Sequence, residues 1–304
     1  MSSFVAIVNP AAGSGRCRGL AKAALERLRS QGVVLEACET RGPGDASRLA
    51  ERAYAEGSRQ FIAVGGDGTA YEILNGLGAA LAPAARGSTN ARATLGFLPL
   101  GTGNSFMRDF GQADVEQAVS AIVTNRRRAC DVLRLETTDS VIHSLNLLSF
   151  GFVAEICSIT NARFKALGTP GYGLGVVTAL ATLHTIPLRM RLDGGPLWEQ
   201  EMVFVSVCNS RFTGGSMMMA PYADTSDGQL DVVVCGAMDR RTLLATFPKI
   251  FSGRHVHHHA ITAARARSIE FFESAPLDLM IDGEVVRAQP TRMDVLPSAI
   301  DVLV

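Results

Sequence analysis

Three features are missing from this sequence, and each absence argues against a class of protein. No stretch reaches the roughly 18–20 apolar residues that a membrane-spanning helix needs, and the nearest approach, LGVVTALATL at 174–183, is too short. Lys and Arg number 29, as do Asp and Glu, so no excess positive charge attracts a polyanion and we expect no nucleic-acid partner. The six cysteines never show C-x-x-C spacing, which predicts buried or half-buried free thiols in a reducing cytoplasm.

The amount of apolar sequence is nevertheless large. With 304 residues, 47% hydrophobic and 19% charged, the chain can form one large or two ordinary domains with real cores. Its first ten residues, MSSFVAIVNP, have a short apolar run without a basic lead or a small-residue cleavage site. They predict a first strand rather than a signal peptide, and hence a cytoplasmic protein.

Residues 1–127 alternate strand-like apolar runs with helix-like stretches. A strand–helix–strand repeat predicts a doubly wound parallel α/β domain with helices on both faces of the sheet. Asp45 is expected to cap the second helix. The expected strands are 4–8, 33–38, 61–64 and 94–98, and the expected helices are 16–29, 46–56 and 69–77.

The pattern changes after about residue 126, where alternating apolar segments are separated by Gly, Asp and Pro. This pattern predicts antiparallel β structure and a β-rich second domain over 128–304, with 293–304 a candidate to return to the first domain. The basic triplet 126–128 is interpreted as a solvated linker face, with contact to anionic lipid as the alternative. The expected strand segments are 131–136, 141–150, 202–207, 230–235, 269–272 and 277–281.

Three glycine-containing loops follow three of the expected strands: 9–16 (NPAAGSGR), 65–69 (GGDGT) and 99–106 (PLGTGNSF). In a doubly wound sheet they lie at the carboxyl ends of the strands, where ligands bind. Glycine lets backbone N–H groups approach a phosphate, and a helix start adds partial positive charge. The loops therefore predict a phosphate-binding edge, although Arg18 stands where a dinucleotide fingerprint has its third glycine and no Gly-Lys-Ser/Thr sequence follows Gly15.

Asp67 is unusual at such an edge, because a carboxylate repels phosphates. Thr69 and Glu72 have the spacing of a capping box, so helix initiation is the plain interpretation of both. Asp67 precedes that expected cap and is not needed for it. A turn-forming aspartate would explain Asp67 alone, but two further glycine loops at the same edge favour a functional role.

These loops resemble the signature blocks of the diacylglycerol kinase and sphingosine kinase catalytic-domain family, in its soluble bacterial lipid-kinase form. The matching blocks are NPAAGSGR, GGDGTAYEILNGL and PLGTGNSFMRDFG, and residues 214–234 and 281–286 (IDGEVV) resemble the second-domain and closing acidic blocks. NAD kinases and phosphofructokinases share only the GGDG signature, whereas the five ordered blocks cover nearly the whole chain. Two departures are Ser105, where the family usually has Asp, and Met107, where it usually has a small residue.

The resemblance implies a first domain like those of NAD kinases and phosphofructokinases and an antiparallel β-sandwich second domain that binds the acceptor. It implies Mg²⁺-dependent transfer of a phosphoryl group from ATP to a hydroxyl of diacylglycerol or a related lipid. The alternatives are a sphingoid-base kinase, a small-molecule kinase of NAD type, and a catalytically inactive lipid- or nucleotide-binding module. The expected nucleotide-binding residues are Asn9, Pro10, Gly13, Ser14, Gly15, Arg16, Gly65, Gly66, Gly68, Thr69, Glu72, Gly101, Thr102, Gly103 and Asn104.

Two acids carry the implied catalysis. The resemblance implies that Glu284 is the general base and that Asp67 orients the acceptor or a metal ion, whereas the residues alone favour a hairpin turn at Asp-Gly-Glu 282–284. In the family a structural Mg²⁺ binds one carboxylate and neighbouring carbonyls. Here these would be Asp227 and backbone oxygens near Asp224 and Gln229, and hard oxygen ligands suit magnesium.

The acceptor lipid would need an apolar slot. Segments 167–190 and 216–221 are glycine-punctuated or rich in methionine, and the family implies the slot there, with core packing as the plain interpretation. Membrane contact is expected to be peripheral, at the inner surface, and a homodimer is one assembly consistent with the resemblance. The histidine-rich segment 254–260 is interpreted as a polar surface turn, with zinc the alternative, and His143 and His184 as core or pocket residues.

Overall fold

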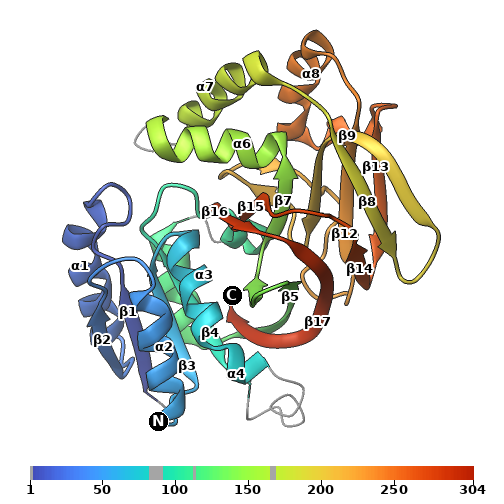
Figure 1. The fold of residues 1–304 in the computed structure, drawn as a ribbon. Coiled ribbons are helices and arrows are strands. Elements are labelled where there is room, and N and C mark those ends of the chain that lie inside the picture. The colour runs from blue at the N-terminus through green and yellow to red at the C-terminus, as the bar shows by residue number, and fades with distance from the viewer. Residues whose placement is uncertain (1–2, 82–91, 112–113, 165–168) are drawn as a thin grey trace. The chain divides into compact units, whose positions relative to one another are not determined.

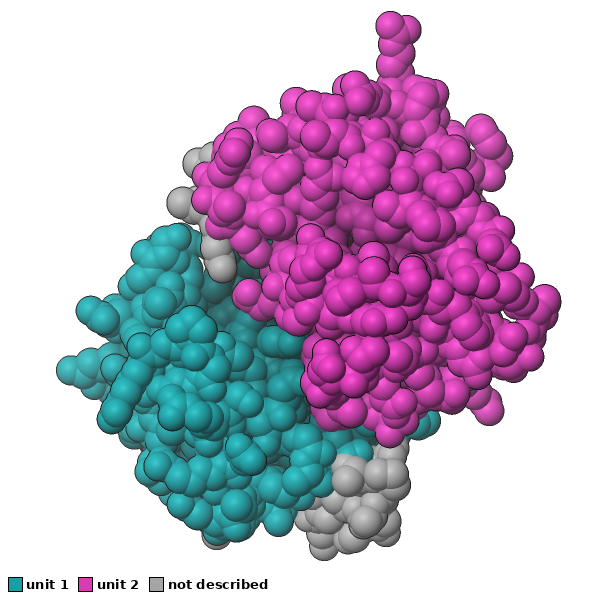
Figure 2. All heavy atoms as spheres, viewed as in Figure 1, with its two compact units in different colours: residues 1–132, 296–304 teal, residues 133–295 magenta. Residues whose placement is uncertain are grey.

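The chain folds as two compact units, which Figure 2 distinguishes by colour. A computed structural model describes residues 3–81, 92–111, 114–164 and 169–304. Unit 1 comprises residues 1–132 and 296–304, and unit 2 comprises residues 133–295. The division lies five residues beyond the expected one, because two strands, β5 (Arg127–Thr137) and β17 (Pro290–Leu303), run through it without a break.

Unit 1 contains a parallel sheet in the order β2-β1-β3-β4, with the end of β17 beside β4 (Figure 1). Strands β1 and β3 are buried along their whole length and β4 at all but its last residue, as expected for strands that helices cover on both faces. The strands are β1 (Phe4–Val8), β2 (Leu35–Glu39), β3 (Gln60–Gly65) and β4 (Thr94–Pro99).

The strand order reverses direction at β1, because β2 lies on one side of it and β3 on the other. Right-handed crossovers then put α1 on one face of the sheet and α2 and α3 on the opposite face. The packing agrees, since α1 and α5 share a buried apolar cluster while α2 packs on α3. The helices are α1 (Arg16–Ser30), α2 (Asp45–Ala55), α3 (Asp67–Gly76), α4 (Gly78–Leu81) and α5 (Val115–Thr124), with a 3₁₀ helix at Phe106–Phe110.

Unit 2 is built on antiparallel strands, as expected. Its sheet runs β16-β15-β7-β9-β8-β14-β17, β12 adds to β9 and carries β13, and β5 pairs with β17 and β6. The long strand β9 joins the parts, because β7 and β8 pair with its two halves along one edge while β12 pairs along the other. The strands are β6 (Val141–Ser144), β7 (Leu147–Gly151), β8 (Ile186–Leu192), β9 (Leu197–Cys208), β10 (Phe212–Thr213), β11 (Met217–Met218), β12 (Leu230–Gly236), β13 (Ile261–Ala266), β14 (Ser268–Phe271), β15 (Leu277–Ile281) and β16 (Glu284–Ala288).

Helices α6 (Phe152–Ile159), α7 (Thr169–Ala179) and α8 (Arg240–Thr246) contribute to the main buried cluster of unit 2. The same cluster takes in Met217 and Met219, so these two methionines are core residues. Residues 167–168 of the expected lipid-binding segment lie outside the described residues, and its remainder forms mainly α7 and β8. Shorter helical turns follow at Thr160–Phe164, Leu180–Thr182, Phe247–Ser252 and Arg254–His257. Across the described residues, no helix combines the length and apolar character needed to cross a membrane.

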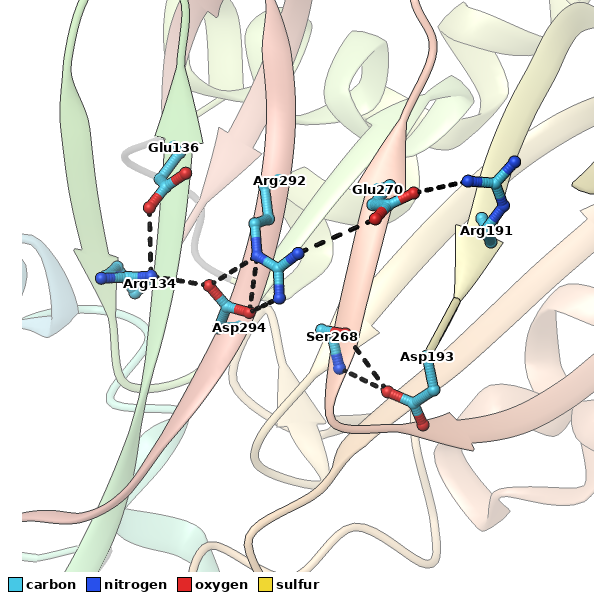
Figure 3. Close-up of polar contacts among 8 residues, drawn as sticks. All are labelled: Arg134, Glu136, Arg191, Asp193, Ser268, Glu270, Arg292 and Asp294. Carbon is cyan, nitrogen blue, oxygen red and sulfur yellow. Dashed lines mark hydrogen bonds and ion pairs between the residues drawn. The ribbon is translucent and has the colours of Figure 1, made fainter. Parts of the chain in front are cut away.

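A row of ion pairs crosses four neighbouring strands of unit 2, β5, β17, β14 and β8 (Figure 3). Arg292 and Asp294 on β17 lie at its centre, with a shortest nitrogen–oxygen distance of 2.7 Å. Because opposite charges on adjacent strands attract, the row favours this strand register. From one side to the other it contains Glu136, Arg134, Asp294, Arg292, Glu270 and Arg191.

The basic triplet 126–128 is exposed, as expected, but it is not a linker. Arg126 donates from Nε to the Val304 carbonyl at 2.8 Å, and Arg127 begins β5. The Arg128 guanidinium lies 5.6 Å from the ring centre of Phe110. These contacts all lie in unit 1, so the triplet is part of that fold.

Candidate active site

The three glycine loops of unit 1 follow β1, β3 and β4 and touch one another through their backbones. A Cβ on Gly101 would lie 2.4 Å from Gly66 Cα, and one on Gly13 would lie 2.6 Å from the Leu100 carbonyl oxygen. Any side chain at these positions would overlap backbone atoms. Gly13, Ser14 and Gly15 also have positive φ angles of 60°, 59° and 86°. The glycines are therefore required for the loops to pack together, as the sequence predicts.

Hydrogen bonds hold the same loops in one arrangement. The Gly65 carbonyl accepts from the amides of Leu100 at 2.8 Å and Gly101 at 2.9 Å. Asn104 donates from Nδ2 to the carbonyls of Pro99 and Gly101, both at 3.2 Å. These bonds occupy the amides of Leu100 and Gly101 inside the edge, so these two amides are not candidate phosphate donors.

The first loop is tied to the second by side chains. Asn9 Nδ2 donates to Thr69 Oγ1 at 3.3 Å, while Asn9 Oδ1 accepts from the Ala11 amide at 3.1 Å. Arg16, at the start of α1, donates from Nε to the Gly13 carbonyl at 3.0 Å. The neighbouring Pro10, Ser14 and Gly15 lie in the turn that these bonds close.

Asp67 is the first residue of α3, and Gly66 is the residue that caps it. The Asp67 carboxylate accepts from the Ser105 amide at 2.9 Å, and a Cβ on Gly103 would come within 3.0 Å of Asp67 Oδ2. It lies at a helix start, where partial positive charge stabilises an anion. The carboxylate is therefore held in place by the third loop, at the position where Ser105 replaces the usual acid.

The predicted capping box is wrong. Thr69 lies inside α3 rather than before it, so its hydroxyl does not cap this helix. Glu72 acts on a different helix, because its carboxylate accepts from the amides of Gly44 at 3.0 Å and Ala46 at 3.1 Å, at the start of α2. The expected cap by Asp45 is wrong for a related reason, since Gly44 precedes α2 and Asp45 is its first residue. Glu72 thus joins α3 to α2.

A small hollow lies at this edge, between the second and third loops. Its wall combines polar groups from both loops with apolar side chains from β3, β4 and the 3₁₀ helix. Thr102 and Gly68 belong to the same loops. The residues that line the hollow are Ala63, Gly65, Gly66, Asp67, Phe97, Leu98, Pro99, Asn104 and Met107.

In unit 2 the segment 282–284 is the hairpin turn that its residues favour. Asp282 and Gly283 have φ angles of 50° and 93°, so both central residues are left-handed, as in a type I′ turn. Ile281 and Glu284 close the turn as paired residues of β15 and β16. The half-buried Glu284 carboxylate has no hydrogen bond or ion pair with any residue that the structure describes.

Asp282 is the buried acid of this turn, 7% exposed. Its carboxylate accepts from the Ser144 hydroxyl at 2.6 Å and from the amides of Leu145, Asn146 and Leu147, each at 3.0 Å. Burial raises the pKa of the Asp282 carboxyl, and these hydrogen bonds oppose the rise by stabilising the charged form. Asp282 is therefore an anchor of the turn rather than an exposed acid.

The loop expected to bind magnesium holds an arginine. Arg265 on β13 lies with Nη1 3.5 Å from Asp227 Oδ2, Nε 3.2 Å from Asp231 Oδ1 and Nη2 2.5 Å from the Tyr222 carbonyl. Burial raises the pKa of the Asp231 carboxyl, and the Arg265 charge opposes the rise.

The remaining oxygen ligands of that loop have other contacts. Asp227 Oδ1 accepts from the Gln229 amide at 3.0 Å, and Asp224 accepts from Ser226. Magnesium takes six octahedral oxygen ligands, of which waters usually supply several, and here the Asp227 carboxylate is already shared between the Arg265 guanidinium and the Gln229 amide.

The histidines show no metal site. Among the described residues, no group of three or more His, Cys, Asp or Glu side chains could hold a metal ion. His255 is 3% exposed and pairs through Nε2 with the Met219 carbonyl at 3.1 Å, so the interpretation of 254–260 as a purely surface turn is wrong at this residue. His143 is buried, as expected, whereas His184 is exposed. All six cysteines are free, and only Cys38 is not fully buried.

The residues that the sequence did not identify are those whose hydrogen-bond partners lie far away along the chain. Asn161 donates from Nδ2 to the Gly283 carbonyl at 3.0 Å, and Cys157 contacts the same oxygen at 3.3 Å. Ser144 lies 138 positions from Asp282 along the chain. No local pattern reveals such pairs, although a left-handed Asp-Gly turn is visible as a hairpin signal.

Two family models match the chain. The diacylglycerol kinase catalytic domain matches residues 3–135, and the YegS C-terminal NAD kinase beta sandwich-like domain matches residues 146–304. A Mycobacterium tuberculosis protein named "Diacylglycerol kinase" is 27% identical, with 100% of this chain and 95% of that protein covered. A Stenotrophomonas maltophilia protein named "Probable lipid kinase YegS-like" is 31% identical, with 91% and 89% covered.

A solved structure has the same fold. The crystal structure of "a putative diacylglycerol kinase" from Bacillus anthracis is 26% identical and gives a TM-score of 0.79 over 99% of this chain and 97% of that one. The expected fold class, a parallel α/β domain followed by a β-rich domain, is confirmed.

Proposed function

The chain belongs to the diacylglycerol kinase catalytic-domain family and is a lipid kinase, and we propose that it transfers the γ-phosphoryl group of ATP to a hydroxyl of diacylglycerol or a related lipid. The observation that carries this proposal is the glycine edge of unit 1. Three loops meet there, beside the start of α3. Their backbones are so close that a Cβ added to Gly101 would lie 2.4 Å from a backbone atom of the second loop, and one added to Gly13 2.6 Å from a backbone atom of the third. Such an edge suits an anionic phosphate chain.

The donor site requires a way to keep Asp67 compatible with phosphates. Mg²⁺ that arrives as the ATP complex would neutralise phosphate charge near this carboxylate. The Ser105 amide fixes the orientation of Asp67, which matters because positioning contributes most of the catalysis of phosphoryl transfer. We assign Asp67 the orientation of the acceptor or of the cation, and the loop amides the binding of the nucleotide.

Glu284 is the proposed general base. Its turn is anchored on both sides, and its carboxylate has no competing partner among the described residues. The acceptor oxygen would attack the γ-phosphorus while its proton passes to Glu284. The bond from the γ-phosphorus to the bridging oxygen of ATP would break, and ADP would leave.

The location of the proposed acceptor lipid favours peripheral contact of the enzyme with a membrane. A diacyl lipid resides in the bilayer and ATP is cytoplasmic, so the enzyme would take its acceptor at the inner membrane surface. The segment 167–190 stays the predicted acyl-chain site. A sphingoid base would need the same chemistry in a differently shaped slot.

The test is transfer of radiolabelled phosphate from ATP by the purified full chain, with and without Mg²⁺. Diacylglycerol in mixed micelles, sphingosine and NAD would be compared as acceptors. We expect labelled lipid product only with magnesium. Label in NAD alone would instead support the small-molecule kinase, and no transfer to any acceptor would support an inactive binding module.

Variants test the assigned residues. Glu284→Gln should lower kcat by roughly 10²–10⁴-fold, because a general base is lost, and Asp67→Asn should lower it by roughly 100-fold through mispositioning. Glu273→Gln is the matched control, since Glu273 is a half-buried acid of unit 2 whose oxygen accepts only a weak amide bond at 3.4 Å. Normal turnover by Glu284→Gln would remove it from the proposed role.

A further inference from the structure

The turn that carries Glu284 is held by a network of polar groups in unit 2, most of them buried. The first link is Asp282, whose Oδ1 accepts from Ser144, Asn146 and Leu147 and whose Oδ2 accepts from Leu145. Four donors converge on two oxygens, and none of them comes from the hairpin itself. The arrangement therefore requires an acceptor-only side chain at Asp282.

The second link holds the segment that supplies those donors. Asn209 follows β9 and is 1% exposed. It donates from Nδ2 to the Leu145 carbonyl at 2.8 Å, and its amide donates to the Asn146 carbonyl at 2.9 Å. The Ser210 hydroxyl donates to Asn146 Oδ1. The segment 144–147 is thus bonded to Asp282 on one side and to Asn209 on the other.

The third link acts on the opposite side of the turn. The Gly283 carbonyl accepts from Asn161 Nδ2 at 3.0 Å and from Cys157 Sγ at 3.3 Å, where α6 passes the hairpin. Both central residues of the turn are therefore fixed by groups from other elements. The backbone of Glu284, the next residue, is therefore held in place as well.

The hairpin does not need this hydrogen-bond network in order to form. Asp-Gly makes a type I′ turn by its own backbone preference, and asparagine would serve equally well at the first position. Burying a carboxylate is unfavourable unless donors surround it. The buried acid and its donors therefore accomplish something beyond turn formation, which is to orient the residue that follows.

We propose that Asp282 and Asn209 are positioning residues that orient the Glu284 carboxylate for proton abstraction. This inference rests on the proposed role of Glu284 as the base. It assigns a function to two buried residues that the reaction does not touch. A small displacement of a base costs a large factor in rate, because proton transfer requires hydrogen-bond geometry.

Four variants of the full chain test the inference. Asp282→Asn keeps the oxygen that accepts three of the four bonds, whereas Asp282→Ala keeps none. Asn209→Ala removes the side-chain bond of the second link to the Leu145 carbonyl without touching the turn, while the backbone bond to Asn146 remains. Ser149→Ala is the matched control, because Ser149 is a fully buried polar residue of the same sheet whose hydroxyl pairs with Ser206 at 2.6 Å.

The expected result is a graded loss of kcat. Asp282→Ala should lower kcat by roughly 100-fold, and Asp282→Asn and Asn209→Ala each by roughly tenfold. The KM for ATP should stay within about twofold of wild type, since these residues belong to unit 2 and the proposed nucleotide loops to unit 1. The acidic limb of the kcat–pH profile should shift, because it reports the base in its altered surroundings.

A merely structural role predicts something different. It would lower the folded fraction, measured by near-ultraviolet circular dichroism, without moving the pH limb, and Ser149→Ala would lose as much activity as Asn209→Ala. Either result overturns the inference. If Asp282→Ala does not fold, Asp282→Asn and Asn209→Ala decide the matter alone.

The outcome also separates this inference from the proposed function. Wild-type lipid phosphorylation that Glu284→Gln abolishes, together with normal kcat in Asp282→Asn and Asn209→Ala, would overturn the inference and leave the function standing. A wild-type enzyme without transferase activity, or a fully active Glu284→Gln, would overturn the assignment of the base and this inference with it.

Discussion

The glycine edge of unit 1 and the acid turn of unit 2 are both rigid, but they are made in opposite ways. At the edge, loops approach because side chains are absent, so that Gly66 and Gly101 meet backbone to backbone. At the turn, side chains are present and buried, and Asp282 is held by donors 135–138 positions away in the sequence. The edge should therefore fail when atoms are added, and the turn when polar atoms are removed.

The largest expected effect breaks the edge. Gly101→Ala places a Cβ 2.4 Å from Gly66 Cα and 2.9 Å from its amide nitrogen, so the second and third loops must separate. We expect kcat/KM for ATP to fall by at least roughly 100-fold, because the phosphate-binding geometry is lost. The measurement is steady-state kinetics with ATP varied.

Gly19→Ala is the control for that change. Gly19 lies in α1, and an added Cβ there meets nothing within 4 Å. Alanine should stabilise this helix slightly and leave kinetics unchanged. Equal kinetics for Gly101→Ala and wild type would show that close approach of the two loops is not required.

The second prediction concerns acid pH and the segment beside the turn. His143 precedes Ser144, and burial together with the adjacent Arg134 charge lowers its pKa from 6.5 to about 4. The unfolded chain binds a proton at His143 below about pH 6.5, whereas the folded chain does so only near pH 4. The contribution of neutral His143 to the free energy of unfolding is therefore fully present above pH 6.5. It is lost as pH falls toward 4, by on the order of 3 kcal/mol.

Urea unfolding between pH 7.5 and 4.5 checks the sign and the size. His143→Gln should show a shallower loss of stability across that range than wild type. His184→Gln, at an exposed position, is the control and should follow wild type. Parallel curves for wild type and His143→Gln would contradict the prediction.

The third prediction tests a second long-range polar contact of unit 2, between Arg265 and the acids Asp227 and Asp231. Arg265→Met leaves Asp231, which is 8% exposed, and Asp227 without their shared cation. We expect a loss of roughly 1–2 kcal/mol at neutral pH, reduced from the cost of a buried pair because Arg265 is partly exposed. The loss should shrink as pH falls, since the variant removes the charge that lowers the pKa of Asp231 and protonation then relieves the repulsion.

Removal of magnesium with EDTA tests directly whether Arg265 or a metal ion neutralises these acids. If the guanidinium is the resident cation, the Tm of the wild-type protein should be the same in EDTA and in Mg²⁺ when nucleotide is absent. A magnesium-dependent rise in Tm that Asp227→Asn removes would support the metal site that the family resemblance implies.

The smallest effect is expected for the half-buried ion pairs of Figure 3. Arg292 joins Asp294 at 2.7 Å and Glu270 at 3.8 Å, but its side chain is 41% exposed. Arg292→Met should lower the free energy of unfolding by about 1 kcal/mol or less, and by less still at high salt. A loss above that of Arg265→Met would contradict the expectation that an ion pair with the buried acid Asp231 contributes more than one with the half-buried Asp294.

Much of the fold was predictable because its cause is local. The buried apolar runs at β1, β3 and β4 and the helices between them were expected, and the parallel sheet of unit 1 is confirmed. The glycine loops were also expected, because glycine is the residue that such turns require. Five ordered blocks identified the family, and the family models confirm it.

The failures share a cause. Thr69 and Glu72 have capping-box spacing, yet Glu72 caps α2 because the packing of α2 on α3 brings the amides of Gly44 and Ala46 within reach. The segment 141–150 was expected as one run, but it divides where its backbone turns toward Asp282. A further long-range contact that no local pattern reveals brings Arg265 to the acid-rich loop at 224–231, where magnesium stays a prediction.

The amino-acid order by itself determined the strands and first three helices of the parallel sheet, the glycine turns and the family, since each depends on backbone preferences or on residues a few positions apart. Only the tertiary structure decided which buried polar group meets which, as with Ser144 and Asp282 or Asp231 and Arg265. The physical reason is that a hydrogen bond or an ion pair requires contact in space at about 3 Å, while separation along the chain imposes no such condition.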